Sequence, residues 1–245
     1  MEIQPISKTE AKRFVVKNHY SNSFPSTVKI ALGFYLDNKL KGVALWGYGV
    51  RPVHTIKKLF PSLNPENYLE LNRLCLTDDM PRNSESQFIK QNAEYIKQNY
   101  PLIKVLFSWA DGLRGKPGFV YQASNWLYGG FIKSEFYINK DNEVIHPRLL
   151  RTRYKTRKIW IDLGLRHVWG YQFRYIKFIC SNKERKLLLK ETPINWNTNY
   201  PKMEDLKFWI QNAGEVSREI RQLPILQGSG QFRNPAPLFA GYGNT

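Results

Sequence analysis

The chain has 245 residues, 42% of them hydrophobic, and its 37 Lys and Arg outnumber its 20 Asp and Glu, which gives a formal charge of +17. This length suits one domain with additions and allows a sizeable buried core. No segment approaches the roughly 18 apolar residues that span a bilayer, so we expect no membrane partner. A charge surplus this large attracts polyanions. Nucleic acid is therefore the expected partner, and a merely solvated basic surface is the alternative.

The first fifty residues predict a strand, a helix and a hairpin. Residues 2–6 are expected to form the strand, and Ser7 and Glu10 have the capping-box spacing that begins a helix. Apolar runs over 29–36 and 40–48 flank an Asp-Asn-Lys turn, which predicts two antiparallel strands.

The middle of the chain predicts a strand–helix–strand crossover. Residues 51–67 contain three prolines and are expected to form a loop-rich insertion. A strand follows over 68–77, and its alternation changes phase near Asn72, which suggests a β-bulge. We expect a helix over 84–99, with a capping box between its first and fourth residues, and a buried parallel strand over 102–109. Ligands bind off the carboxyl ends of such strands, so chemistry is expected there.

The last hundred residues carry weaker patterns. The expected elements are a helix from Pro117 to about 128, a strand over 131–138, strand-like runs at 158–162 and 171–180, and a helix over 203–212. We expect a catalytic domain over 1–180, an extension over 181–226 that packs on it, and a flexible tail over 227–245.

Asp111 is the strongest catalytic candidate, because it ends a buried strand between two small residues and would accept a proton there. A turn or N-cap role is the alternative. Tyr121, Ser124 or Asn125, and Tyr128 share one face of the next predicted helix, where Tyr121 would act as a general acid or position a leaving group. An aromatic packing stripe is the alternative reading of that face.

Two further groups of residues suggest binding chemistry. Arg114 and Lys116 lie in a glycine-rich loop before that helix, where backbone N–H groups would help to bind a phosphate. His19 and Tyr20 close the first helix, and the histidine would be a base or a metal ligand. An interaction of His19 with the helix dipole is the alternative.

Residues 148–190 hold thirteen Lys or Arg and two acids, and so carry +11 of the formal charge. Aromatic residues run through this segment, and their rings would stack on exposed bases while the cations bind phosphates. A sheet with core aromatics and outward cations is the alternative. The cations expected to contact DNA are Arg148, Arg151, Arg153, Lys155, Arg157 and Lys158.

Several common motifs are absent from the sequence, among them the P-loop, the dinucleotide-binding glycine fingerprint and the usual zinc-ligand spacings. The two cysteines, Cys75 and Cys180, have apolar neighbours and are expected to be buried free thiols in a reducing cytoplasm.

Six segments together resemble the Mom family of phage DNA-modification proteins. They are 17–20 (Lys-Asn-His-Tyr), 42–47 (Gly-Val-Ala-Leu-Trp-Gly), 71–74 (Leu-Asn-Arg-Leu), 81–86 (Pro-Arg-Asn-Ser-Glu-Ser), 108–112 (Ser-Trp-Ala-Asp-Gly) and 118–126 (Gly-Phe-Val-Tyr-Gln-Ala-Ser-Asn-Trp). The resemblance covers about residues 5–180.

The resemblance implies an α/β fold like that of GNAT acyltransferases, with a mixed, splayed central sheet flanked by helices and here a basic C-terminal extension. It implies conversion of adenine in double-stranded DNA to N6-carbamoylmethyladenine, which blocks restriction enzymes. By the same resemblance His19, Tyr20, Asp111 and Tyr121 would be site residues, and the first three would hold an iron ion, leaving an open position for catalysis.

The chain departs from ordinary GNAT enzymes at the loop that binds pyrophosphate. Residues 78–84 (Asp-Asp-Met-Pro-Arg-Asn-Ser) replace the usual glycines, which argues against tight binding of acetyl-CoA. Arg82, Asn83 and Ser84 would still meet an anionic group. Glycyl-tRNA is the alternative donor, because it contains a glycine unit and suits a basic surface. The rival functions are a non-enzymatic DNA-binding protein and a conventional N-acetyltransferase.

Overall fold

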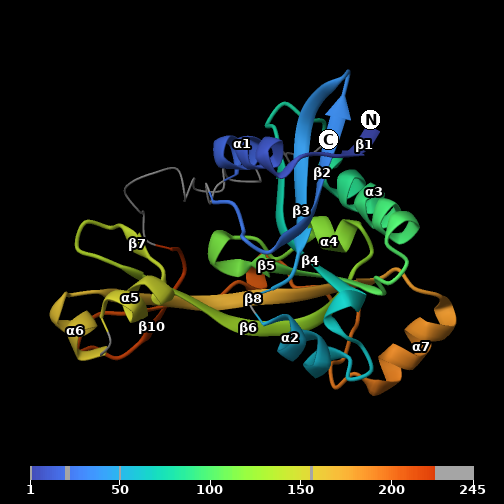
Figure 1. Cartoon of the computed structure of the whole chain (residues 1–245). Helices are drawn as coiled ribbons and strands as arrows, with labels where there is room; N and C mark the ends of the chain where they lie inside the picture. The colour runs from blue at the N-terminus through green and yellow to red at the C-terminus, as the bar shows by residue number, and fades with distance from the viewer. Residues whose placement is uncertain (1, 20–22, 50, 155–156, 224–245) are drawn as a thin grey trace, which may run out of the picture. The chain divides into compact units, whose positions relative to one another are not determined.

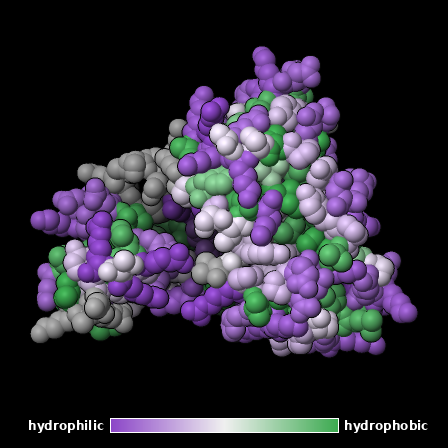
Figure 2. Space-filling view, in the orientation of Figure 1, coloured by the Kyte–Doolittle hydropathy of each residue, from purple (hydrophilic) through white to green (hydrophobic). Residues whose placement is uncertain are grey.

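The computed structural model describes residues 2–19, 23–49, 51–154 and 157–223, with only the backbone described for Arg157 and Lys158. The chain forms two compact units. The first comprises Met1–Ala110, Gly118–Gly130 and Phe173–Tyr200, and the second comprises Asp111–Pro117, Phe131–Gln172 and Pro201–Thr245. Figure 1 labels the elements, and Figure 2 shows hydrophilic side chains over much of the visible face.

The first unit contains β1 (Glu2–Pro5), α1 (Lys8–Asn18), β2 (Val28–Leu36), β3 (Lys39–Gly47), α2 (Pro52–Leu59), η1 (Pro65–Asn67), β4 (Tyr68–Leu76), α3 (Ser84–Asn99), most of β5 (Val105–Asp111), α4 (Phe119–Ala123), the start of β6 (Leu127–Ile138), the end of β8 (Arg166–Phe178) and α7 (Asn182–Glu191). Its strands follow the order β1-β2-β3-β4-β5-β8. All the neighbours from β1 to β4 are antiparallel, whereas β4 and β5 are parallel.

Helices α1 and α3 cover opposite faces of β2 and β3 (Figure 1). Side chains alternate along a strand, so Val43 and Leu45 pack against α1 in one buried cluster. Trp46, which follows Leu45, lies on the other face, where its indole N–H donates to Asn92 Oδ1 of α3 at 2.8 Å. On that face Phe34 also stacks on Phe88 of α3, with ring centroids 4.8 Å apart. The sheet is therefore buried on both sides here.

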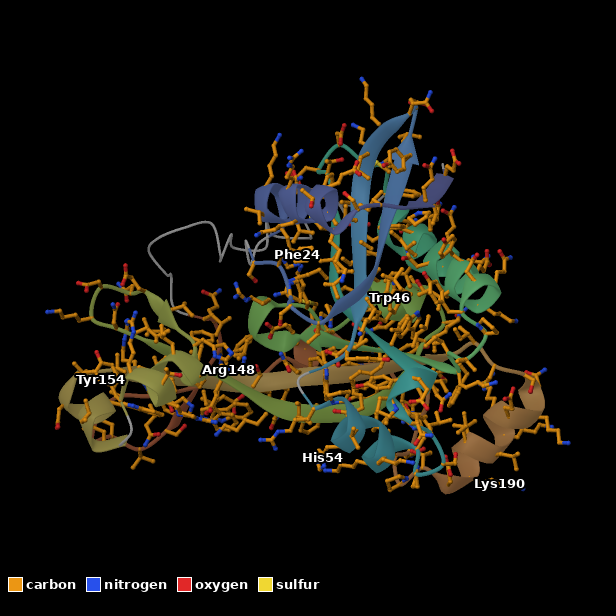
Figure 3. All side chains as sticks on the ribbon, in the orientation of Figure 1. Phe24, Trp46, His54, Arg148, Tyr154 and Lys190 are labelled. Atoms are coloured by element: carbon orange, nitrogen blue, oxygen red, sulfur yellow. The ribbon has the colours of Figure 1, made fainter. Side chains whose placement is uncertain are left out.

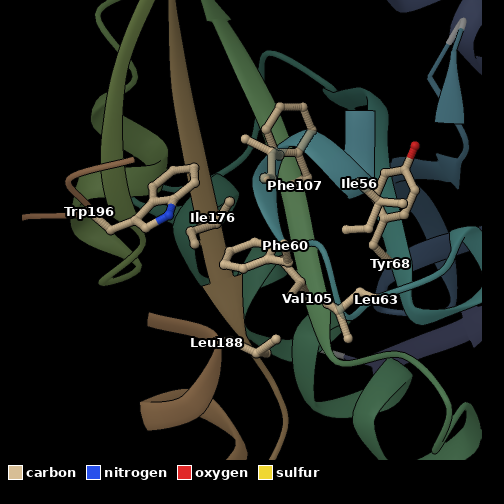
Figure 4. Packing of buried hydrophobic residues seen from close by; sticks show 10 residues of the cluster. Ile56, Phe60, Leu63, Tyr68, Val105, Phe107, Ile176, Leu188 and Trp196 are labelled. Carbon is tan, nitrogen blue, oxygen red and sulfur yellow. The ribbon is translucent and has the colours of Figure 1, made fainter. Parts of the chain in front are cut away.

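A second buried cluster surrounds the paired part of β4 and β5 (Figure 4). Ile56 and Phe60 enter it from α2 and the residue that follows, and Leu188 enters it from α7. These residues join Val105, Phe107 and Ile176 of the strands, so the helices α2 and α7 close this end of the unit over apolar surface.

The second unit contains η2 (Gly112–Arg114), the remainder of β6, β7 (Val144–Ile145), α5 (Pro147–Arg153), α6 (Arg157–Asp162), the start of β8, η3 (Met203–Asp205), β9 (Phe208–Gln211) and β10 (Arg218–Ile220). Its strands follow the order β8-β6-β7, and β9 pairs with β8 and with β10. One face of this sheet forms a core whose buried members are Leu113, Phe136, Ile138, Val168, Phe208 and Ile210.

The structure confirms most of the predicted N-terminal elements. The hairpin of β2 and β3 turns at Asp37 and Asn38, which both have positive φ, as the two-residue hairpin turn requires. Ser7 Oγ accepts a hydrogen bond from the Glu10 N–H at the start of α1. The mixed α/β sheet flanked by helices is the fold class that the sequence predicts, and both cysteines are free thiols.

Some local predictions are wrong. Residues 51–67 are not mainly loop, because Pro52 begins helix α2, whose Ile56 and Leu59 supply a buried stripe. The capping box at Ser84 is absent: Asn83 is the N-cap of α3, and Ser84 Oγ donates instead to the Pro81 carbonyl at 2.7 Å.

The helix predicted from Pro117 to about 128 is also wrong in extent. It is limited to α4, and Asn125, with φ of 56°, lies between it and β6. Tyr128 is therefore in β6 and does not share a helix face with Tyr121.

Two predictions in the second unit are wrong as well. The run at 158–162 belongs to helix α6, and Trp160 of α6 packs edge-on against Tyr137. The predicted helix over 203–212 is instead the 3-10 turn η3 followed by β9, because Phe208 and Ile210 alternate into the sheet core. No helix in the described part of the chain has the length and hydropathy that membrane spanning requires.

Candidate active site

A β-bulge interrupts β4, as the sequence predicts. Across the β3–β4 ladder Leu45 pairs with Arg73 and Trp46 pairs with Leu71, so Asn72 is the extra residue. The parallel pairing of β4 with β5 covers only three residue pairs and ends at Glu70 and Phe107. The two strands therefore stop pairing where the bulge begins.

Side-chain hydroxyls occupy the position where the pairing stops. Ser108 Oγ lies 2.8 Å from Tyr121 Oη and 3.5 Å from the Leu71 carbonyl oxygen. Ser108 is buried, with 1% of its surface exposed. This serine thus connects β5 with α4 and with β4 at the first unpaired position.

The ring of Tyr121 is held by aromatic neighbours and is 8% exposed. Its centroid lies 5.2 Å from Trp126 and 5.1 Å from Tyr175. Gln122, the next residue of α4, donates through Nε2 to Tyr175 Oη at 3.1 Å. These contacts fix the direction of the Tyr121 hydroxyl, and they also give the ring a packing role.

Glu70 is a carboxylate in this largely apolar environment. Its Oε2 lies so close to Gly49 that a Cβ on that glycine would be 2.4 Å away. No hydrogen bond or ion pair reaches the carboxylate from the described residues. Burial raises the pKa of Glu70 to about 7, so this group exchanges a proton near neutral pH. It also contributes to raising the pKa of the buried Tyr68 hydroxyl, after desolvation.

Ser124 joins three elements of the first unit. Its Oγ lies 2.7 Å from the Val120 carbonyl and 3.2 Å from the Ser86 carbonyl of α3. Its own carbonyl accepts a hydrogen bond from Lys177 Nζ of β8 at 2.8 Å. The hydroxyl therefore links α4 to the first turn of α3, which is a positioning role.

In the loop before α3, residues 78–83, Asp79 is bound by Lys41 of β3. Lys41 donates to Asp79, and this hydrogen bond lowers the pKa of the carboxyl. Asn83 adopts left-handed φ of 69°, Arg82 is exposed and Ser84 is buried. Binding of an anion by these last three residues stays a prediction.

Asp111 belongs to the second unit, where its Oδ1 accepts the Leu113 N–H at 3.1 Å. This is the N-cap role that the sequence offered as an alternative. Arg114 Nε lies 3.7 Å from Asp111 Oδ2, and the carboxylate side chain is 26% exposed. Burial raises the pKa of Asp111, while Arg114, the Leu113 N–H and Lys116 oppose the shift. Arg114 and Lys116 thus act on Asp111, and their contact with a phosphate stays a prediction.

The other residues predicted for the metal site are His19 and Tyr20. His19 is buried at 6% exposure, and its backbone N–H donates to the Val15 carbonyl as the C-cap of α1. It belongs to the first unit, whereas Asp111 belongs to the second, and Tyr20 lies outside the described residues. Among described residues no group of three or more His, Cys, Asp or Glu side chains is arranged around a metal position. The iron site therefore stays a prediction.

Three of the predicted DNA-binding cations are described, and they belong to the second unit; Figure 3 labels Arg148. Arg148, Arg151 and Arg153 are exposed on α5. Arg151 Nη2 lies 3.7 Å from Glu135 Oε1. Lys155 and the side chains of Arg157 and Lys158 lie outside the described part.

Sequence reasoning missed Glu70 and Ser108 as site candidates. Each is a lone polar side chain in an apolar strand, within Tyr-Leu-Glu-Leu and Leu-Phe-Ser-Trp respectively. That isolation was an available signal, because a polar group in a buried strand needs a partner or a function.

Together these features define a mixed α/β protein in which the parallel pair of β4 and β5 opens at a bulge beside a buried Ser–Tyr pair. The chain belongs to the Mom protein family, which it matches over residues 1–202. It is 32% identical to "Methylcarbamoylase mom" of Escherichia phage Mu over 196 residues, which are 78% of this chain and 80% of that protein.

Solved structures with a partly similar fold include acetyltransferases. An N-acetyltransferase from Staphylococcus aureus Mu50 is 15% identical with a TM-score of 0.41, and the match covers 73% of this chain and 97% of that one. The aminoglycoside 6'-N-acetyltransferase from Enterococcus faecium is 11% identical with a TM-score of 0.41, covering 74% and 99% respectively.

Replacing Glu70 by Gln should stabilise the fold at alkaline pH. The pKa of Glu70 is raised on folding, so its protonated form is stabilising below the unfolded pKa, and that contribution is lost as pH rises through about 7. We expect Glu70→Gln to gain on the order of 2 kcal/mol at pH 8 and little at pH 4, measured by urea unfolding across this range. Glu66→Gln, at an exposed position, is the control. An equal gain at both pH values would contradict the shift.

The Ser108–Tyr121 contact should appear as a coupling energy. Ser108→Ala and Tyr121→Phe should each cost about 1–2 kcal/mol, because each removes the hydrogen bond between these two buried hydroxyls. The double variant should cost less than the two together in urea unfolding, with the exposed Tyr100→Phe as control. Additive costs would show that the two hydroxyls do not interact.

Proposed function

We propose that the chain is a transferase that converts adenine in DNA to N6-carbamoylmethyladenine and thereby protects phage DNA from restriction. The observation that carries this proposal is the membership of the Mom family, with 32% identity to a methylcarbamoylase over 78% of the chain. The formal charge of +17 suits a DNA substrate, since Lys and Arg bind phosphates regardless of sequence.

The substrate sets two demands on the enzyme. The exocyclic amino group of adenine is a poor nucleophile, because its lone pair is delocalised into the ring. It is also hydrogen-bonded within the duplex, so the base must leave the stack at a cost of about a few kcal/mol. Contacts to phosphates and stacking on aromatic side chains would offset that cost.

Asp111 is the proposed proton acceptor. With glycyl-tRNA as donor, adenine N6 bonds to the glycyl carbonyl carbon, the ester bond to the tRNA breaks and its terminal oxygen takes up a proton, and an N6 proton passes to the Asp111 carboxylate. The N6-glycyl product is an isomer of N6-carbamoylmethyladenine, so a second step must exchange the two nitrogens between the carbonyl and methylene carbons. Burial raises the pKa of this carboxyl, which makes its ionised form a stronger base. Arg114 and Lys116 oppose the shift and so favour the ionised state that accepting a proton requires.

Tyr121 is proposed to orient the donor or the base. Its ring is fixed by Trp126 and Tyr175, and its hydroxyl is already positioned by Ser108. Ser124 supports the same helix from its C-terminal side. His19 and Tyr20 would relay protons or, with Asp111, hold the iron ion that would act as a Lewis acid or redox centre.

The donor is proposed to be glycyl-tRNA, with acetyl-CoA as the alternative. A glycyl group and a carbamoylmethyl group contain the same atoms, but the nitrogen is bonded to the methylene carbon in the first and to the carbonyl carbon in the second, so the donor supplies every atom and an isomerisation completes the product. The loop before α3 lacks the glycines of the acyl-CoA enzymes, and its Asp79 is held by Lys41. This loop disfavours a pyrophosphate, which supports the first donor.

Replacing Asp111 by Asn should abolish modification and leave DNA binding intact. The chain would be expressed with a plasmid, and nucleosides from the plasmid would be analysed by mass spectrometry for an N6-carbamoylmethyl adduct. We expect the adduct with the natural chain and at least a hundredfold less with Asp111→Asn, since a general base contributes about 10²–10⁴-fold. The exposed Asp141→Asn is the matched control in the same unit.

Two outcomes would contradict this assignment. Loss of DNA binding by a folded Asp111→Asn variant would make the residue structural. Unmodified plasmid DNA together with tight gel shifts by the natural chain would favour a non-enzymatic DNA-binding protein.

The donor can be assigned with purified components. We expect transfer of label to DNA from glycyl-tRNA charged with carbon-labelled glycine, and none from labelled acetyl-CoA, because of the altered loop before α3. Uncharged tRNA mixed with free labelled glycine is the control. Transfer from the CoA ester alone would rule out the tRNA donor and favour a conventional acetyltransferase.

A further inference from the structure

The second unit has a sheet face that is separate from its core. Val168, Phe208 and Ile210 point into the core cluster. Because side chains alternate along each strand, the neighbouring positions point to the opposite face. The aromatic and cationic side chains on this opposite face are Phe131 and Lys133 of β6, Trp169 and Tyr171 of β8, and Trp209 of β9. We call these five residues the aromatic face.

The rings of the aromatic face contact one another across three strands. Trp169 and Trp209 are directly opposite in the β8–β9 ladder, and their rings stack with centroids 3.9 Å apart and planes inclined by 7°. The ring of Tyr171 approaches Trp209 edge-on at 5.4 Å and lies 4.1 Å from Phe131. The four rings therefore form one continuous apolar surface.

This surface is accessible and carries a cation. Phe131 is 53% exposed, and the other three rings are partly exposed. Lys133 Nζ lies 4.3 Å from the centroid of Trp169, in cation–π contact. The stacked pair of Trp169 and Trp209 is covered on the Trp169 side by Lys133, so Phe131 and Tyr171 are the rings that remain for a ligand. Exposed rings next to a cation are the combination by which proteins bind unpaired nucleic acid, since bases stack on the rings and the cation meets the phosphates.

The charges around the aromatic face favour an anion. Glu135, the next residue on this face of β6, lies 2.8 Å from His167 Nε2 and 3.7 Å from Arg151 Nη2, and the charge of the arginine offsets that of the carboxylate. Lys207, just before β9, is exposed. Glu219 of β10 is an acid beside this face, because it pairs with Trp209 at the edge of the sheet.

The same face continues along its strands into a cavity of about 320 Å³. Tyr137, His167 and Gln211 line it, and they lie two residues beyond Glu135, Trp169 and Trp209 on their respective strands. Trp160 of α6 supplies a further aromatic wall. A planar ring system with hydrogen-bonding edges, such as a single nucleobase, suits this lining.

We propose that the aromatic face binds the unpaired bases of a DNA strand by stacking. The inference rests on the proposed function, which requires bases to leave the duplex, and it identifies the surface that receives them. Bases inside an intact duplex hide their faces, so the aromatic face would discriminate in favour of unpaired strands. A stacked neighbour or opposite base would then be kept from closing the duplex again.

The proposal can be tested by measuring the binding of a fluorescent oligothymidine to the full chain through its fluorescence anisotropy. Oligothymidine offers base faces and phosphates but no adenine, so the readout does not depend on the reaction. We expect Phe131→Ala and Tyr171→Ala each to weaken binding roughly tenfold, which corresponds to the loss of one base stack. Tyr171→Phe keeps the ring and should retain the affinity of the natural chain.

Ile132→Ala is the matched control, because Ile132 is 39% exposed and neighbours Phe131 on the other face of β6. Lys133→Gln should lower the dependence of affinity on salt, and Glu219→Gln should strengthen binding. Circular dichroism would confirm that each variant is folded.

Equal weakening by Phe131→Ala and Ile132→Ala, or no change on losing the Tyr171 ring, would overturn the proposal. A change of oligomeric state alone, seen by sedimentation of Phe131→Ala, would assign the face to a second copy of the chain and would also overturn it. If adenine is modified but the aromatic-face variants bind oligothymidine as the natural chain does, this inference fails and the proposed function stands. If the aromatic face binds oligothymidine but no adenine adduct forms, the proposed function fails and this inference stands.

Discussion

One extra residue in β4 sets the conditions for the candidate active site. Because Asn72 has no counterpart in β3, the strand leaves the parallel ladder after Glu70. Backbone groups of β4 that would otherwise bond to β5 then require other partners. The Leu71 carbonyl finds one in the hydroxyl of Ser108. The fixed position of the Tyr121 hydroxyl follows from that serine. A regular β4 would keep pairing with β5 and leave no room for side-chain chemistry between them.

The two buried carboxylates illustrate different ways of tuning a proton-exchanging group. Glu70 is shifted by desolvation alone, so its proton affinity depends on how dry the first unit keeps it. Asp111 is desolvated as well, but a guanidinium, an ammonium and a backbone N–H pull its pKa back down. Removal of Arg114 or Lys116 would therefore raise the pKa of Asp111 further, whereas the pKa of Glu70 changes only when its exposure to water changes.

The sequence predicts the elements whose signals are local. The capping residue Ser7, the turn at Asp37 and the phase change near Asn72 each have a short-range cause, and the structure agrees with all three. The run at 158–162 and the segment at 203–212 are misread because their burial is decided by distant partners such as Tyr137. Of the candidate site residues, Asp111 and Tyr121 can be predicted from the sequence, because they come after the carboxyl end of a predicted parallel strand. Glu70 and Ser108 acquire significance only through the register of β4 against β5.

The stacked indoles of Trp169 and Trp209 have an optical consequence. Two indoles whose ring centroids are 3.9 Å apart couple their electronic excitations, and a pair whose transition moments are skewed gives ultraviolet circular dichroism bands of opposite sign. The coupling falls with distance, so this contact should contribute more than the other stacked indole pair, Trp46 and Trp126, whose centroids are 6.4 Å apart. The second unit thus contains an intrinsic spectroscopic probe that reports on its own strand pairing without any label.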